Sequence, residues 1–340
     1  MSEQPFVSVV TPFYNTADYL RECVESVLAQ THANFEYLLV DNQSTDGSAE
    51  IAAEYAKLDP RIRVIRNAEF VGQVPNYNGA LRHVSPDARY VKIVQADDYI
   101  FPECLERMVA VGESNPTAAI IGSCYLEGRY VCGSGIEFPT ECIPGRVAIR
   151  LHLLENFFLF GTPTNLMYRA DVVAARQPFF SESVMHEDTE LCYEVLEEAD
   201  FGFVHQVLTM NRRGNGGILT SLQPFHWYPV FWYTTLRKFG SRFLSEQELP
   251  DRVGPARSEY LRILGESVVL RREPEFWDYH RRALANVGEK LPSALALSPQ
   301  IARAAVKAAL KPKWFLKQRG EFQHRARAQH NGSSQSRRDS

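Results

Sequence analysis

Short apolar runs alternate with amphipathic stretches along the first hundred residues of the chain. Four of these runs predict buried strands, at residues 6–11, 35–40, 62–65 and 90–94. The stretches between them repeat apolar side chains at helical spacing, as Leu20, Val24 and Val27 do, and predict helices, at residues 16–30, 48–58 and 73–84. Because strands and helices alternate, we expect a parallel sheet whose strands are joined by right-handed crossovers.

The pattern becomes less regular after residue 100. Strands are predicted at residues 118–125 and 201–210, with a glycine-containing hairpin arm at 128–138. Helices are predicted at residues 102–113, 147–158, 170–175 and 187–198. We therefore predict an α/β domain over residues 1–222, with a mostly parallel sheet and flanking helices. A helical region over 223–317 and a basic, disordered tail over 318–340 follow it.

Composition restricts the class of protein. The chain has 340 residues, of which 45% are hydrophobic, enough for a substantial core. No apolar run is long enough to cross a bilayer, and the first residues resemble no secretory signal, so we predict a cytoplasmic protein. The six cysteines form no CxxC pair, which favours reduced thiols over a zinc site.

The net charge of −4 hides an asymmetry between the ends of the chain. From Ile301 onward there are ten basic and two acidic residues, which give +8 and leave −12 for residues 1–300. A basic tail on an acidic body favours an anionic partner surface. The segment 306–316 and the lysines around it could lie on an anionic membrane, and a short solvated helix is the alternative.

The sequence QADDY at residues 95–99 carries the first sign of chemistry. Asp97 and Asp98 directly follow the predicted strand at 90–94, and carboxylates there would lie at the rim where open α/β sheets bind ligands. Two adjacent carboxylates repel each other unless a cation lies between them. Their oxygen ligands suit Mg²⁺ or Mn²⁺ together with substrate phosphates. The alternative is a solvated turn that caps the next helix.

The predicted strand ends carry TPFYN, VDNQSTDGS and QADDY, which would gather on one rim of a parallel sheet. Together with HEDTEL at residues 186–191, this set resembles the family 2 glycosyltransferases of the GT-A fold, over roughly the first 221 residues. The resemblance implies a sugar nucleotide donor, usually a divalent metal, and sugar transfer with inversion. It implies a nucleotide-binding half over about residues 1–100 and an acceptor half over about 101–222.

The resemblance assigns the nucleotide to the first rim segments. Thr11, Pro12 and Tyr14 match the turn that holds base and ribose, where an aromatic ring offers a stacking face. Packing in the core is the alternative for the aromatic side chains. Asp41 matches the carboxylate that accepts the imide N–H of uracil, and helix capping, for which Asp46 competes, is its alternative. Asn76 is a further expected nucleotide contact.

The same resemblance assigns the diphosphate and the reaction. Asp97 is expected on the ribose hydroxyls, Asp98 on Mn²⁺ or Mg²⁺, and Arg212 on the diphosphate. Asp188 matches the catalytic base, which removes the proton of the acceptor hydroxyl, and a first-turn helix acid is its alternative. Thr164, with the asparagine after it, would lie near a sugar.

Two positions depart from the family pattern. Gln95 stands where the family often has a further aspartate, and Tyr77 stands where it commonly has an arginine. The first departure puts metal dependence in doubt, and the second puts a phosphate or base contact in doubt.

We therefore predict an inverting transferase of the hexosyl or N-acetylhexosaminyl type. It would move a sugar from a nucleotide-diphosphate sugar, with UDP favoured, to a hydroxyl of a glycan or lipid-linked glycan. By analogy, the enzyme would act in the assembly of a cell-surface polysaccharide at the inner membrane face. We expect no nucleic-acid partner. The alternatives are a sugar nucleotidyltransferase, whose phosphate loop is absent after the first strand, and a catalytically silent binding scaffold. The aromatic run at 224–236 predicts a buried helix or dimer surface, or an acceptor groove.

Overall fold

The structure is a computed structural model that describes residues 4–155, 158–182, 186–213, 222–313 and 315–316. The chain divides into two compact units, Met1–Asn215 and Gly216–Ser340. The predicted tail over 318–340 lies outside the described residues.

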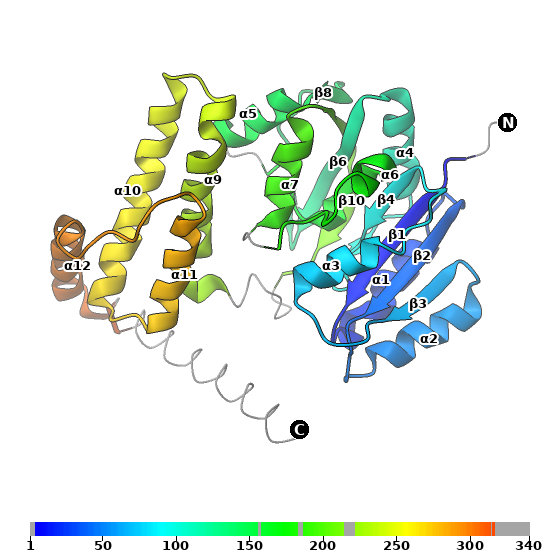
Figure 1. The fold of residues 1–340 in the computed structure, drawn as a ribbon, viewed down its shortest axis with the longest axis horizontal. Coiled ribbons are helices and arrows are strands. Elements are labelled where there is room, and N and C mark those ends of the chain that lie inside the picture. The colour runs from blue at the N-terminus through cyan, green and yellow to red at the C-terminus, as the bar shows by residue number, and fades with distance from the viewer. Residues whose placement is uncertain (1–3, 156–157, 183–185, 214–221, 314, 317–340) are drawn as a thin grey trace. The chain divides into compact units, whose positions relative to one another are not determined.

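The first four strands form the parallel half of a ten-stranded sheet in unit 1 (Figure 1). Their order is β3-β2-β1-β4, and each neighbouring pair is parallel. The elements of this half are β1 (Val7–Phe13), α1 (Ala17–Leu28), β2 (Phe35–Asp41), α2 (Ser48–Leu58), β3 (Ile62–Arg66), α3 (Gln73–Leu81) and β4 (Tyr90–Ile93). The register pairs Phe13 with Asp41, so β1 and β2 end at the same edge of the sheet.

The second half of the sheet is mixed. A strand at Leu166–Arg169, β9, lies antiparallel between β4 and β6, whereas β6 and β10 are parallel to each other. The other elements of this half are β5 (Tyr99–Ile100), α4 (Cys104–Ser114), β6 (Ala118–Glu127), β7 (Tyr130–Cys132), β8 (Cys142–Pro144), α5 (Gly145–Glu155), the 3-10 helix η1 (Pro163–Asn165), α6 (Ala170–Ala174), α7 (Glu187–Leu196) and β10 (Asp200–Asn211). The order continues β9-β6-β10-β5.

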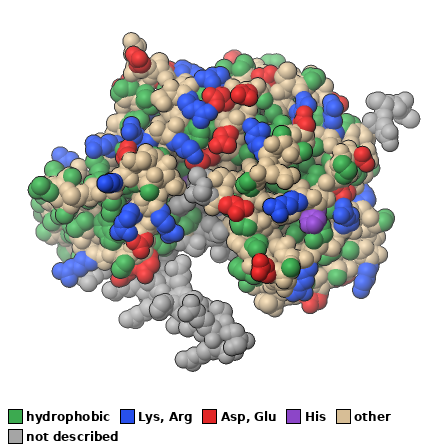
Figure 2. All heavy atoms as spheres, in the orientation of Figure 1, with side chains coloured by type: hydrophobic (Ala, Val, Ile, Leu, Met, Phe, Trp, Pro, Cys, Tyr) green, Lys and Arg blue, Asp and Glu red, His purple; other side chains and the backbone are tan. Residues whose placement is uncertain are grey.

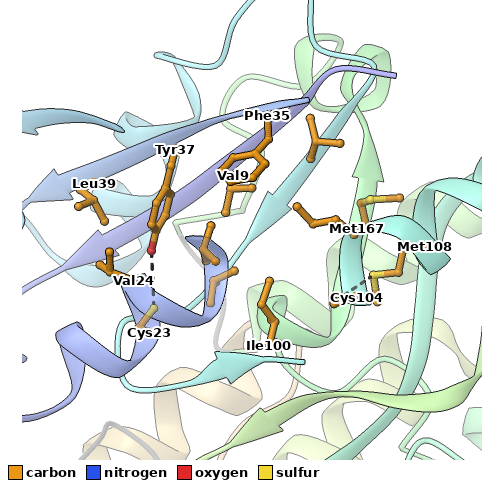
Figure 3. Packing of buried hydrophobic residues seen from close by; sticks show 14 of the residues in the cluster. Val9, Cys23, Val24, Phe35, Tyr37, Leu39, Ile100, Cys104, Met108 and Met167 are labelled. Carbon is orange, nitrogen blue, oxygen red and sulfur yellow. Dashed lines mark hydrogen bonds between the residues drawn. The ribbon is translucent and has the colours of Figure 1, made fainter. Parts of the chain in front are cut away.

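The core of the parallel half packs side chains of the sheet against α1 (Figure 3). Val9, Val24 and Tyr37 are fully buried, and each buried aliphatic side chain contributes about 1.5–3 kcal/mol. The Tyr37 hydroxyl finds partners inside this core, because its oxygen lies 3.0 Å from Thr11 Oγ1 and 3.8 Å from Cys23 Sγ. The well-packed core below the sheet therefore fixes the positions of the strand ends.

Unit 2 is helical over its described residues. Its elements are the 3-10 helix η2 (Gln223–Phe225), α9 (Trp227–Phe243), α10 (Glu248–Val269), α11 (Pro274–Ala285) and α12 (Ser298–Leu310). Tyr233 of α9 stacks on Tyr260 of α10, with ring centroids 5.5 Å apart and both rings buried. The buried positions of α9 favour the buried helix among the interpretations of the aromatic run at 224–236.

The predicted fold class is confirmed, including the helical C-terminal region. The predicted strands and helices of unit 1 are present, although the hairpin arm at 128–138 shrinks to the short strand β7. The strands β5, β8 and β9 and the helix η1 were not predicted. They have two to four residues each, too few to show a period. Within the described residues, no helix is long and apolar enough to span a membrane.

Candidate active site

The carboxyl ends of β1, β2 and β4 lie side by side at one edge of the sheet (Figure 1). Asn42 N donates to Phe13 O at 2.9 Å, and Val94 N donates to Val10 O at 3.0 Å. The segments TPFYN, VDNQSTDGS and QADDY therefore meet at one rim, as the topology predicts. The end of β10 reaches the same rim, since Arg212 N donates to the acidic turn.

Asp41 presents a carboxylate oxygen that accepts no hydrogen bond from the described residues. The residue is only 1% exposed. Its Oδ1 accepts a hydrogen bond from Ser44 N at 2.8 Å, whereas its Oδ2 accepts none. Arg66 Nε lies 3.4 Å from Oδ2, close enough for charge attraction but without the geometry of a hydrogen bond. Because a buried acceptor without a donor is costly, Oδ2 is suited to an N–H from a ligand.

Helix capping, the alternative role considered for Asp41, is performed by Asp46. Its Oδ1 accepts from Ser48 N at 3.0 Å and from Ser48 Oγ at 2.6 Å, and its Oδ2 accepts from Ala17 N at 2.9 Å. Burial alone would raise the pKa of Asp46, but these hydrogen bonds outweigh it and lower that pKa. Asp41 is therefore not needed as a helix cap, and its carboxylate can serve a ligand at the rim.

Two exposed aromatic rings flank this part of the rim. Tyr14 follows β1 and is 44% exposed, and Phe70 is 59% exposed. Their ring centroids lie 4.7 Å apart with the planes tilted by 55°. Large apolar rings in contact with each other and with solvent offer a face on which a flat base can stack.

Three residues that we expected to bind nucleotide lie below the rim. Thr11 is fully buried and its hydroxyl is engaged in the core by Tyr37. Pro12 is buried within β1. Asn76 is 4% exposed, and its Oδ1 accepts a hydrogen bond from Asn67 Nδ2 at 2.9 Å. All three side chains are buried, and their contacts with a nucleotide stay predictions.

Asp97 and Asp98 differ in burial although they are adjacent. Asp98 is 4% exposed, and it accepts hydrogen bonds from Thr164 Oγ1 at 2.7 Å and from Arg212 N at 2.9 Å. Burial, and then the charge of Asp97, raise the pKa of Asp98 to about 7. Asp97 is the more exposed of the two. Asp98, expected to bind the metal, therefore has both oxygens engaged inside the protein, and Asp97 is the more accessible carboxylate of the pair.

The donor set at the rim fits a metal that is shared with a substrate. Among the described residues, no cluster of three or more His, Cys, Asp or Glu side chains could hold a metal by itself. Mg²⁺ is usually bound by one or two carboxylates together with substrate phosphates. Asp97 supplies such a carboxylate, so the rim suits a divalent cation in the company of a phosphorylated ligand.

Arg212 is held at this rim by several groups. Its Nε donates to Asp97 O at 2.8 Å, and its Nη2 pairs with the carboxylate of Glu22. The guanidinium carbon lies 5.2 Å from the ring centroid of Tyr19 and 5.7 Å from that of Tyr99. A guanidinium matches phosphate as well as carboxylate, so this oriented side chain is available to an anionic ligand that replaces Glu22.

Asp188 is the second residue of α7, which lies over β6 (Figure 1). Burial raises the pKa of Asp188, and burial and then the charge of Asp188 raise the pKa of Glu187 to about 7. A first-turn acid that only complements the helix dipole would have its pKa lowered. Burial therefore dominates here, and the carboxylate is a stronger base than an ordinary aspartate. The residue before the helix, His186, has a left-handed backbone with φ 70°.

Sequence reasoning missed one buried residue next to this site. Lys92 is fully buried, and its Nζ donates to Thr164 O and, at 3.0 Å, to Leu166 O. The signal was available, because Lys92 interrupts the apolar run YVKIV. Thr164, expected near a sugar, is fully buried as well and donates its hydroxyl to Asp98.

The two departures from the family pattern contact each other. Gln95 Nε2 donates to Tyr77 Oη at 3.1 Å, and Tyr77 is 7% exposed. They therefore form one uncharged hydrogen-bonded pair at the base of the rim.

Comparisons with known proteins agree with this geometry. The family model "Glycosyl transferase family 2" matches residues 8–173. Glycosyltransferase GlyG of Streptococcus pneumoniae is 36% identical over 242 residues, which cover 67% of this chain and 76% of GlyG. TuaG of Bacillus subtilis, whose name links it to teichuronic acid biosynthesis, is 40% identical over 106 residues, 31% of this chain and 41% of TuaG.

Solved structures share the fold. S. aureus TarS 1-349, solved in complex with UDP-GlcNAc, has a TM-score of 0.59 and 19% identity, and the match covers 96% of this chain and 92% of TarS. The mannosyltransferase PcManGT from Pyrobaculum calidifontis, solved with GDP-Man and Mn²⁺, has a TM-score of 0.52 and 18% identity over 93% of this chain and 85% of PcManGT. The family model and the long alignment with GlyG decide the assignment: the chain belongs to glycosyl transferase family 2.

Proposed function

We propose that the chain transfers a sugar, with inversion, from a nucleotide-diphosphate sugar to a hydroxyl group. The observation that carries the donor assignment is the buried Asp41 Oδ2, which accepts no hydrogen bond from the described residues. It lies on the same rim as the exposed rings of Tyr14 and Phe70. Uracil offers an imide N–H to such an oxygen and a flat face to such rings. A UDP-sugar is therefore the donor we propose, in keeping with the TarS complex.

The donor diphosphate would lie between the acidic turn and Arg212. Arg212 is already oriented there by Asp97 O and by its pair with Glu22. The diphosphate would displace the exposed carboxylate of Glu22 and take its place on the guanidinium. Residues 1–100 would thus bind most of the nucleotide, and residues 101–222 would supply the acceptor side.

A divalent cation, Mn²⁺ or Mg²⁺, would be held by Asp97 and by phosphate oxygens of the donor. When bound, it would neutralise charge on the departing nucleoside diphosphate. This assignment moves the metal to Asp97 from Asp98, to which the resemblance had assigned it. The reason is that Asp98 already accepts two hydrogen bonds inside the protein.

Asp188 is the proposed base for the reaction. As the acceptor oxygen attacks the anomeric carbon, its proton passes to the Asp188 carboxylate. The bond between that carbon and the diphosphate oxygen breaks at the same time, and the nucleoside diphosphate leaves with the electron pair. The burial that raises the pKa of Asp188 makes it a better proton acceptor for this step.

The acceptor we propose is a hydroxyl of a glycan or lipid-linked glycan in cell-surface polysaccharide assembly. The name of TuaG supports this assignment. A peripheral contact with an anionic membrane would have to come from the basic residues after 300. On the face in Figure 2, cationic and anionic side chains are interspersed, so this face offers no surface of a single charge.

The test compares the wild type with Asp188→Asn in a sugar-transfer assay, with UDP binding measured by calorimetry in parallel. We expect transfer and UDP binding for the wild type, and UDP binding without transfer for the variant. A panel of UDP-sugars and oligosaccharide acceptors identifies the pair used. UDP binding without turnover in both proteins would favour the silent scaffold instead, and the absence of nucleotide binding would refute the proposal.

A further inference from the structure

We propose that Thr164 and Lys92 are positioning residues, which clamp the acidic turn at residues 95–98 to the end of β10. The clamp would set the places of Asp97 and Arg212 for the donor diphosphate. This inference rests on the proposed function, but it concerns two fully buried side chains that touch no ligand.

One hydroxyl group closes the acidic turn. Thr164 Oγ1 accepts a hydrogen bond from Gln95 N at 3.0 Å and donates to Asp98 Oδ2 at 2.7 Å. The turn itself is closed by Asp98 N, which donates to Gln95 O at 2.9 Å. Thr164 therefore holds both ends of the turn, and Asp97 is the residue held between them.

The neighbouring residue holds the end of β10. Asn165 Nδ2 donates to Thr209 Oγ1 at 2.6 Å and to Asn211 Oδ1 at 3.0 Å, and Asn211 Nδ2 donates back to Asn165 Oδ1 at 2.9 Å. Asn211 is the last residue of β10 and directly precedes Arg212. Thus η1 joins the acidic turn to the strand that delivers the arginine.

Lys92 binds the backbone of η1 and of the first residue of β9. Its ammonium group donates to Thr164 O and Leu166 O, the carbonyls on either side of Asn165. In the described parts of the chain no carboxylate lies within ion-pair distance of it. A buried cation without a carboxylate partner is expensive in stability. Its place is better explained by the two carbonyls and by the attraction of its charge to the acidic turn.

The clamp connects with the diphosphate end of the donor site and not with the base end. It reaches Arg212 through Asp98, whose Oδ1 accepts from Arg212 N. The hydrogen bonds and ring contacts described for Asp41 and Tyr14 involve none of its members. A damaged clamp should therefore weaken the binding of diphosphate and leave the binding of the nucleoside intact.

The experiment uses Thr164→Val, which keeps the shape and removes the hydroxyl, and Thr164→Ser, which keeps the hydroxyl. Calorimetry on the full chain measures uridine and UDP, the latter with and without Mn²⁺. For Thr164→Val we expect UDP affinity to fall by about tenfold, which is the worth of roughly one hydrogen bond. Uridine affinity should stay within about twofold of the wild type, and Thr164→Ser should retain wild-type UDP affinity.

Thr235→Val is the matched control, because it removes a buried hydroxyl from α9 in unit 2. It should leave both affinities unchanged, and thermal unfolding reports the loss of stability in each variant. Equal UDP affinity in Thr164→Val and the wild type would overturn the clamp, and so would a parallel loss of uridine and UDP binding. If Thr164→Val does not fold, failure of Thr164→Ser to retain UDP affinity decides against it. A wild type that binds no nucleotide would refute the proposed function instead.

Discussion

Replacing Asp41 with Asn tests the base-binding assignment at a single atom. The change retains an acceptor for Ser44 N, which Asp41 Oδ1 now binds at 2.8 Å. It converts Oδ2, the buried oxygen that accepts no hydrogen bond from the described residues, into an amide that donates. Uracil would then meet a donor with its own imide N–H, whereas cytosine would meet it with an unprotonated ring nitrogen.

The expected loss follows from the hydrogen bond that would disappear. A hydrogen bond to a charged group is worth about 1.5–3 kcal/mol, so UDP affinity should fall roughly 10- to 150-fold. Folding should be little affected. The variant loses only the contact at 3.4 Å with the half-exposed Arg66, and such pairs contribute about 0–1 kcal/mol.

Calorimetry with UDP and CDP, combined with urea unfolding, measures both effects. The control is Asp46→Ala, because Asp46 binds Ser48 and Ala17 at the start of two helices. That change should lower the free energy of unfolding by about 1–2 kcal/mol and leave UDP affinity unchanged. Asp41→Asn should show the reverse pattern and a shift in preference toward CDP. Wild-type UDP affinity in Asp41→Asn would refute the assignment of the uracil contact to this oxygen.

Four further predictions concern the diphosphate and the reaction. Asp188→Asn should abolish transfer while UDP binding persists. Because the raised pKa of Asp188 keeps the base protonated to higher pH, kcat/KM in the wild type should decline on the acid side above the usual aspartate range. Glu187→Gln should leave that decline in place, since burial raises the pKa of Asp188 and Glu187, whose own pKa is about 7, is uncharged where Asp188 titrates. Glu22→Gln should tighten UDP binding by up to about fivefold in low salt, since it removes the exposed carboxylate that competes for Arg212; weaker binding would mean that Glu22 only orients the arginine. Asp97→Asn should remove the gain in UDP affinity that Mn²⁺ provides, and a persistent gain would place the metal elsewhere.

The parallel half of the sheet could be predicted because its elements are long and periodic. Residues 48–58, for example, were predicted as a helix with the bounds that α2 has. The antiparallel strand β9 was missed because its four residues, LMYR, show no alternation. Its place between β4 and β6 is decided by long-range pairing, which the local pattern does not contain. The same holds for β5, whose two residues pair with β10.

The motifs predicted which segments meet at the rim, since parallel strands end at a common edge. They could not predict which side chains face a ligand. Thr11 and Asn76 lie within segments that reach the rim, yet both are buried and hydrogen-bonded to neighbours. Thr11 lies in β1, which is buried on both faces, and Asn76 lies in the helix α3, so their burial depends on the elements packed around them. The burial of Thr164 depends on tertiary contacts in the same way.

The charges of Asp97 and Asp98 can be interpreted only together with the burial of each side chain. Two adjacent acids at a strand end suggested that both serve a cation, because they would otherwise repel each other. The structure relieves the repulsion differently. Asp98 is withdrawn from solvent and receives two hydrogen bonds, and the buried Lys92 lies near enough for its charge to attract that of Asp98. One carboxylate thus organises the turn, and the other is the more exposed of the two. A lysine inside an apolar strand run was the one sign of this arrangement in the sequence.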